Sequence, residues 1–111
     1  MKVQILHNNL ADGRWAELSL FEQLGNIGSE VGRARKNQNR DEKLFLGAVD
    51  RALELFDLTL ADSRWRGRRY EIARAREVFC DAINGGDEYQ SSLGSLENYF
   101  TSFAIAARQN I

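Results

Sequence analysis

Proline is absent from this chain of 111 residues, and cysteine and histidine occur once each. Because proline interrupts helices and is common in loops, its absence is typical of a chain that is nearly all helix with short links. With Cys80 as the only cysteine, an intrachain disulfide and cysteine-type metal clusters are excluded, and a reducing setting is indicated. With His7 as the only histidine, metal sites built from several histidines are excluded as well, so we expect no metal and no cofactor.

Net charge and long apolar runs are also scarce. The chain has 15 lysines and arginines against 16 acids, so it has no overall field that would attract nucleic acid or a membrane surface. No apolar stretch approaches the roughly 20 residues that a membrane-spanning helix needs. No basic start with a following apolar run resembles a secretion signal. We therefore expect a soluble, cytoplasmic protein without a membrane partner.

The apolar residues that are present predict a single all-α domain. Hydrophobic residues make up 43% of the chain, which is enough for one core at this length. Their three-and-four spacing is that of amphipathic helices. In chain order, helices are expected from about Ser19 to the polar link 36–41, from about Asp41 to Ala61, from a start within 64–70 to about Ile83, and from an N-cap at Ser95. We predict an antiparallel four-helix bundle over residues 19–111, preceded by a short N-terminal arm over residues 1–18.

Three glycines, Gly25, Gly28 and Gly32, fall near one side of the first expected helix. Each costs up to about 1 kcal/mol of helix stability relative to alanine, so a compensating interaction is required. Small residues on one side of a helix allow another backbone to approach closely. We expect close helix packing at these glycines, with approach of a ligand as the alternative use of the same gap.

The second half of the 41–61 helix is apolar on nearly all sides. Leu55 and Leu58 point away from the stripe that contains Phe56, so the helix has a second apolar face. A four-helix domain of this size has little room for a fully central helix. We therefore expect a homodimer with Leu55 and Leu58 in its interface, and a different protein is the other partner considered.

The stretch 63–69, SRWRGRR, is a concentration of positive charge in a chain that is slightly acidic overall. Six arginines and one glutamate lie between positions 64 and 76. On the helix that follows, Arg76 falls among small apolar neighbours, so its charge needs a carboxylate inside the fold. The expected structural ion pairs involve Glu30, Asp50, Asp57 and Arg76.

The same arginines have an alternative use, which is the binding of RNA or a nucleotide. Arg64, Arg66 and Arg69 are the members expected to be exposed. Exposed guanidinium groups bind phosphate, and a local cluster can do so in a chain without net positive charge. We expect internal ion pairing to be the main role of the arginines and keep nucleic-acid binding as the alternative.

Catalytic groups are few. Asp50, Glu54 and Asp57 lie on consecutive helical turns and could hold Mg²⁺, which prefers oxygen ligands. The spacing of Glu54 and Asp57 is similar to one half of the motif of all-α nucleotide pyrophosphohydrolases, but the upstream acidic half is missing. Cys80 lies on an apolar flank without a histidine on its own helix, so we expect a packed thiol. The sequence favours a non-catalytic protein, with a Mg²⁺-dependent hydrolase as the second alternative.

Four segments carry a resemblance to known proteins: LGNIGSEVGRA, ALELFDLTLAD, REVFCDAI and YFTSFAIAAR, which begin at residues 24, 52, 76 and 99. They resemble a group of small, uncharacterised prokaryotic four-helix proteins. That group in turn loosely resembles the nucleotide-binding HEPN-like helical bundles. HEPN ribonucleases carry a motif in which a histidine follows an arginine, and here His7 precedes every arginine. The resemblance therefore implies a binding or dimerising role without nuclease chemistry.

Overall fold

The computed structural model describes residues 13–86 and 92–109. Within these residues the elements are helical and there is no strand, which confirms the all-α prediction. In chain order the elements are α1 (Trp15–Glu17), α2 (Leu20–Asn37), α3 (Glu42–Ala61), the 3₁₀ helix η2 (Ser63–Arg68), α4 (Arg69–Ile83) and α5 (Leu93–Gln109). Residues 1–12 of the predicted arm lie outside the described residues. The remainder of the arm lies against the bundle, because Trp15 is buried in the core.

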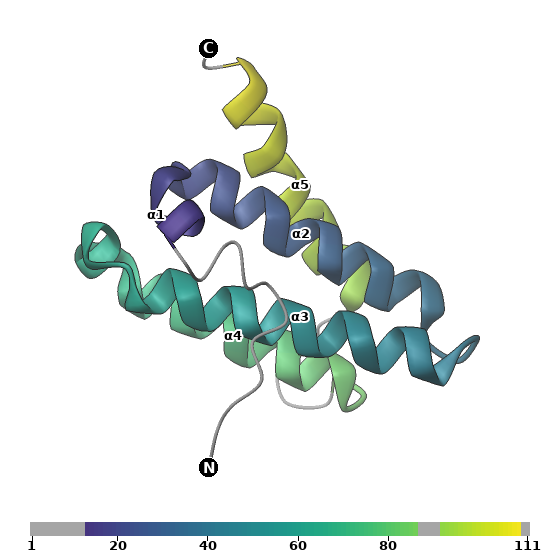
Figure 1. Cartoon of the computed structure of the whole chain (residues 1–111). Helices are drawn as coiled ribbons and strands as arrows, with labels where there is room; N and C mark the ends of the chain where they lie inside the picture. Colours follow the sequence, from purple (N-terminus) through teal and green to yellow (C-terminus); the bar gives the residue numbers. More distant parts are fainter. Residues whose placement is uncertain (1–12, 87–91, 110–111) are drawn as a thin grey trace.

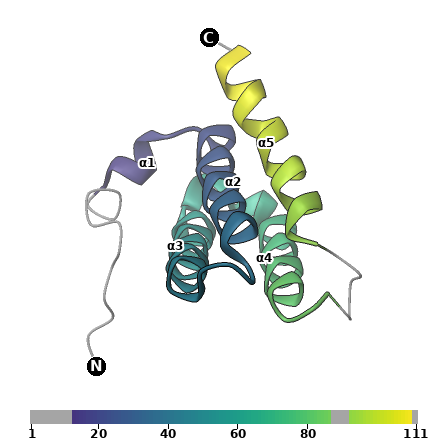
Figure 2. The ribbon, with the colours of Figure 1, turned by 90° about the vertical axis from the view of Figure 1, so that its right-hand side faces the viewer.

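Helix α2 packs against two partners, α3 along one side and α5 along another (Figures 1 and 2). Helices α2, α3 and α4 run in alternating directions, with α4 beside α3 (Figure 1). Helix α5 crosses α2, and its C-terminal turns extend past the other helices in both views (Figures 1 and 2). The first half of α5 therefore lies among the other helices, whereas α2 is the only described element beside its second half.

The starts of α2 and α3 follow from short capping sequences. The Ser19 hydroxyl accepts the Glu22 N–H at 3.1 Å, and the Glu22 carboxylate accepts the Ser19 N–H at 2.9 Å. This reciprocal capping box satisfies two amide groups that the first turn would leave unpaired. Asp41 caps α3 by accepting the Leu44 N–H at 3.0 Å. Both predicted starts are confirmed.

The glycines of α2 face α5. A Cβ atom placed on Gly28 would lie 2.6 Å from the Phe100 Cβ, and one placed on Gly25 would lie 2.9 Å from the Ala104 Cβ. Carbon atoms do not pack that closely, so α5 can cross α2 here only because both side chains are absent. The close-packing prediction is confirmed for these two glycines. At Gly32 the nearest atoms belong to the Glu97 side chain.

The core lies between α2, α3, α4 and α5. The Phe56 ring contacts those of Phe79 and Phe100, with centroids 5.8 Å and 5.7 Å apart, and all three side chains are fully buried. Leu55 is in the same core with 2% of its surface exposed, so the prediction that it faces another chain is wrong. It lies one turn from the fully buried Thr59 on the same stripe of α3, and helices of the same chain cover that stripe.

The stretch before α4 and the start of α5 differ from their predicted forms. The Ser92 hydroxyl accepts the Ser95 N–H at 3.1 Å, so Ser92 is the cap of α5 and Ser95 already lies in its first turn. Before α4, the backbone at Trp65 has φ −104° and ψ 23°, outside the helical region. The stretch 63–69 therefore turns a corner and does not simply extend α4 toward its N-terminus.

Candidate binding site at the arginine corner

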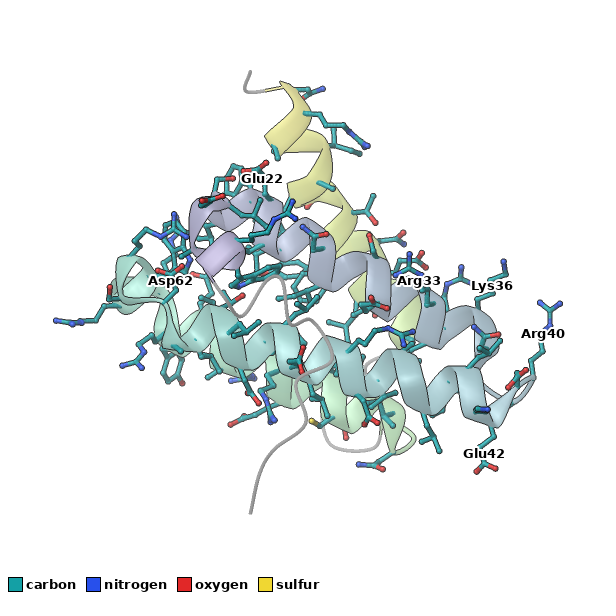
Figure 3. The ribbon with its side chains drawn as sticks, in the orientation of Figure 1. Glu22, Arg33, Lys36, Arg40, Glu42 and Asp62 are labelled. Atoms are coloured by element: carbon teal, nitrogen blue, oxygen red, sulfur yellow. The ribbon has the colours of Figure 1, made fainter. Side chains whose placement is uncertain are left out.

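The turn between α3 and α4, residues 62–70, is called the arginine corner below. It lies at one end of the α3–α4 pair, close to α1 and the start of α2 (Figure 1). Asp62 stands at its beginning (Figure 3), and its carboxylate accepts the Arg64 N–H at 3.0 Å. This short Asx-type bond turns the chain directly after α3 ends. The corner therefore has a defined backbone.

A buried glutamine joins the arginine corner to α1 and α2. Gln23 has 0% of its surface exposed. Its Oε1 accepts the Trp65 indole N–H at 3.0 Å, while its Nε2 donates to the Trp15 carbonyl at 2.8 Å and to Asp62 Oδ2 at 3.2 Å. Each of these groups would cost about 1–3 kcal/mol if it were buried without a partner. Gln23 thus fixes both neighbouring segments against α2.

Trp15 adds a second buried bond to this network. Its indole N–H donates to Thr59 Oγ1 at 3.2 Å, and the Thr59 hydroxyl donates to the Leu55 carbonyl at 2.9 Å. Both side chains are buried, so the indole has a partner where water cannot supply one. Neither the burial of Trp15 nor the network around Gln23 was predicted from the sequence.

A signal for this network is present in the sequence as a short repeat. Residues 10–15 read LADGRW and residues 60–65 read LADSRW, a difference of a single position. The tryptophans that end the two copies both bond Gln23, one through its backbone carbonyl and the other through its indole N–H. The repeat therefore marks two segments that meet at the same side chain. Residues 10–12 lie outside the described part of the chain.

Arg64 is held by its own chain. Its Nη2 lies 2.6 Å from Asp62 Oδ2 and 2.8 Å from the Leu18 carbonyl, and its guanidinium carbon lies 4.4 Å from the Trp65 ring centroid. The side-chain hydrogen bond from Arg64 is the main reason why the pKa of Asp62 falls from 3.8 to about 2, although burial acts in the opposite direction. The same bond raises the pKa of Arg64. Arg64 is exposed, as predicted, but its guanidinium group also ties α1 to the corner.

The other predicted nucleic-acid ligands, Arg66 and Arg69, remain at the surface. The Arg69 Nε donates to the Leu60 carbonyl at 3.0 Å, which uses one of the five N–H donors of its guanidinium group. Arg66 forms no ion pair with any residue in 13–86 or 92–109. Tyr70, on the first turn of α4, has 84% of its surface exposed. The outer face of the corner therefore combines two cations with an open aromatic ring.

The predicted pair of Arg76 with a helix acid is present, but it lies at the surface. The Arg76 Nε lies 3.1 Å from Asp57 Oδ1, and the Asp57 side chain is 62% exposed. Exposed pairs of this kind contribute about 0–1 kcal/mol, far less than a buried charge would require. Asp50 is exposed and forms no ion pair with any of the described residues. The expectation that Asp50 pairs inside the fold is therefore corrected.

Among the described residues Glu30 is the buried acid, and its partners differ from the one predicted. Its carboxylate lies 3.2 Å from the Arg51 Nε and 3.0 Å from an Arg33 terminal nitrogen. Arg51 belongs to α3, so this contact joins α2 to α3. Glu30 therefore contributes a structural ion pair, with Arg51 and Arg33 in place of Arg76.

The acids considered for Mg²⁺ binding do not form such a site. Among the described residues, no three His, Cys, Asp or Glu side chains are close enough together to hold a metal ion. Asp57 is engaged by Arg76, and Cys80 is half-buried on α4. Nothing in this part of the chain supports the hydrolase alternative.

Comparisons of the chain with protein-family models, with curated proteins and with solved structures gave no match. None of the helices within the described residues combines the length and the apolar content that crossing a bilayer requires. Two surfaces of the molecule are candidates for binding a partner: the outer face of the arginine corner and the C-terminal half of α5.

Proposed function

We propose that this chain is a non-catalytic interaction module of the cytoplasm, an antiparallel four-helix bundle that forms a homodimer. The observation that carries this proposal is the C-terminal half of α5. Residues 103–107, FAIAA, are five apolar residues in succession, and at 3.6 residues per turn they cover every side of the helix. A helix that is apolar on all sides is normally buried on all sides.

The described residues, 13–86 and 92–109, cover only one side of this segment. Ala104 lies on Gly25, and the Phe103 ring contacts that of Phe21 with centroids 5.5 Å apart. Ile105 points elsewhere and has 43% of its surface exposed. The last turns of α5 extend past the other helices (Figures 1 and 2). A second copy of the helix would remove the remaining apolar surface from water.

A groove beside the same segment offers room for side chains of a partner. It has a volume of about 370 Å³ and lies between α2 and α5, with Gly25 and Ala107 among its lining residues. Glu22 and Arg108, of opposite charge, also line it. In a two-fold dimer each copy contributes the same patch, so Glu22 of one chain can face Arg108 of the other. The groove is therefore compatible with a symmetric pair.

This surface replaces the interface predicted on α3. Leu55 belongs to the core, and Leu58 is half-buried. Leu58 lines an open pocket of about 300 Å³ together with Trp15 and Ala16, so α1 already shields part of it. The dimer proposal accordingly rests on α5 and no longer on α3.

The test is the solution mass of the purified protein and of three glutamate variants, measured by light scattering over a range of concentrations. We expect the parent protein to have the mass of a dimer and Ile105→Glu to have that of a monomer, because a charge in an apolar interface costs several kcal/mol. Leu44→Glu is the matched control, since Leu44 is also exposed, at 54%, but lies on α3. Leu58→Glu tests the surface predicted from the sequence and should leave the mass unchanged.

Two outcomes would contradict the proposal. A parent protein with the mass of one chain at every concentration would remove self-association altogether. Monomers from Leu58→Glu, with Ile105→Glu still dimeric, would move the interface back to α3.

A further inference from the structure

Tyr70 is the most exposed large hydrophobic side chain of the described residues. Its exposure is 84%, whereas Leu44, Leu46, Tyr99 and Ile105 lie between 43% and 54%. It is the second residue of α4, which directly follows η2, so its backbone is held while its ring lies in water. An aromatic ring that is open to solvent can stack on a nucleobase, and it does so for any base because every base has a flat apolar face.

The positive charge near this ring is not cancelled within the fold. Arg69 precedes Tyr70 directly, and Arg66 lies in η2, four positions before it. Three other arginines of the region are each paired with an acid: Arg64, Arg68 and Arg76. The excess charge is therefore concentrated at Arg66 and Arg69, both of which precede the exposed ring by one to four positions along the chain.

The corner that carries these groups is held in place before any ligand arrives. Gln23 bonds Trp65 and Asp62 from inside, and Arg69 is oriented by its bond to the Leu60 carbonyl. A ligand would thus need to order only the outer side chains, which lowers the entropic cost of binding. The site differs in this respect from a cluster of arginines on a free loop.

We infer that the outer face of the arginine corner binds single-stranded nucleic acid, with Tyr70 stacking on a base and Arg66 and Arg69 contacting the flanking phosphates. An acidic protein surface would engage the arginines but has no flat base to cover the ring. A duplex would offer phosphates but keeps its bases inside the stack. The combination of an open ring and two unpaired cations fits a single strand best.

The test measures the affinity of short fluorescein-labelled oligoadenylates, as RNA and as DNA, by fluorescence anisotropy at a series of salt concentrations. With two phosphate contacts, the logarithm of the binding constant should fall with the logarithm of salt concentration with a slope of about −1.4. Tyr70→Ala should weaken binding on the order of tenfold, and Tyr70→Phe, which keeps the ring, should bind like the parent protein. Binding of either the ribo- or the deoxyribo-strand supports the proposal.

The arginines are tested in the same titrations. Arg66→Ala should weaken binding and reduce the steepness of the salt dependence by about 0.7. Arg40→Ala is the matched control, because Arg40 is also exposed but lies at the far end of α2 from Asp62 (Figure 3). All of the substituted side chains are exposed, and circular dichroism verifies that each variant is folded.

Four results would overturn the proposal. The first is an absence of binding to either strand at the lowest salt concentration. The second is equal binding of a duplex of the same length, together with no effect of Tyr70→Ala, which would leave only a general attraction to phosphate. The third is equal loss of binding in Arg66→Ala and Arg40→Ala. Displacement of the strand by polyglutamate at equal charge concentration would likewise indicate an acidic protein as the partner.

Discussion

The two ends of α2 are attached to the rest of the molecule by different kinds of bond. At its first turns, hydrogen bonds of the uncharged Gln23 side chain reach α1 and the arginine corner. Farther along α2, ion pairs join it to its neighbours: Glu30 pairs with Arg51 of α3, and Arg35 pairs with Glu97 of α5. Figure 3 shows Asp62 near the first of these ends, with Arg33 and Lys36 toward the other.

The difference lies in access to water. Gln23 is fully buried, whereas each ion pair includes at least one arginine that is partly in solvent. A buried hydrogen bond cannot be replaced by water, so its loss leaves unsatisfied groups in the core. A partly exposed ion pair is weakened by salt and can be replaced by hydration. We therefore expect the Gln23 end to contribute more to stability and to be insensitive to salt.

The largest effect is expected at Gln23. Gln23→Ala should lower the free energy of unfolding by about 3 kcal/mol, because the Trp65 indole N–H and the Trp15 carbonyl both lose a buried partner. Urea unfolding followed by tryptophan fluorescence measures the change. Asn26→Ala is the matched control, since Asn26 is exposed on the next turn and bonds only the Glu22 carbonyl. Equal losses in the two variants would remove the distinction between the ends of α2.

A smaller effect is expected at Glu30. Glu30→Gln should cost about 1.5 kcal/mol in low salt, because Arg51 and Arg33 lose their charged partner while remaining partly hydrated. In concentrated sodium chloride the loss should shrink, whereas the loss in Gln23→Ala should not change. Urea is the denaturant for both measurements because it carries no charge. A Glu30→Gln loss that is the same at every salt concentration would contradict this contrast.

The smallest effect is expected from the titration of Asp62. Its pKa is about 2 in the folded protein and 3.8 as the ordinary value, so the folded state favours the charged form. The resulting stability is complete above about pH 4 and is lost as the pH falls from 4 toward 2. We expect about 1 kcal/mol, less than the shift alone implies, because the Arg64 partner is open to solvent.

The measurement is the free energy of unfolding of the parent protein and of Asp62→Asn across this pH range. The difference between the two curves removes the contribution of the other carboxyl groups. That difference should be largest above pH 4 and should vanish near pH 2. A constant difference would show that the charge of Asp62 is not what stabilises the corner.

Much of the fold was predictable because it depends on neighbours along the chain. The capping box of Ser19 and Glu22 marks the start of α2, and the glycines of α2 indicated a close helix crossing that Gly25 and Gly28 make. The atoms of the capping box lie within one turn of the same helix, and the glycines recur with the helical period. Both patterns can be recognised in the sequence without knowing which helix packs against α2.

The candidate site was predictable only in part. The excess of positive charge at residues 64–76 indicated the correct region. It did not indicate which of the arginines are bonded within the fold and which have no acidic partner. Arg64 donates a hydrogen bond to the carbonyl of Leu18, which lies 46 residues earlier in the chain. No sequence pattern around either residue predicts a contact between segments so far apart. Tyr70 was not singled out, because exposure of a tyrosine depends on which helices pack beside it. The prediction for Leu55 was wrong for the same reason. Periodicity shows which residues of α3 share a face, but it does not show how many of those faces are buried by other helices.

By itself, the sequence determined the all-α class, the bounds of most helices to within a few residues, and the location of the excess positive charge, since these properties arise from local spacing and composition. The tertiary structure alone decided that Trp15 and Gln23 form a buried network, that the exposed Arg64 is held by Asp62 and the Leu18 carbonyl, and that the described residues leave part of the end of α5 uncovered. The physical reason is that burial and pairing depend on the contacts of segments distant in the chain, and these exist only once the helices have packed.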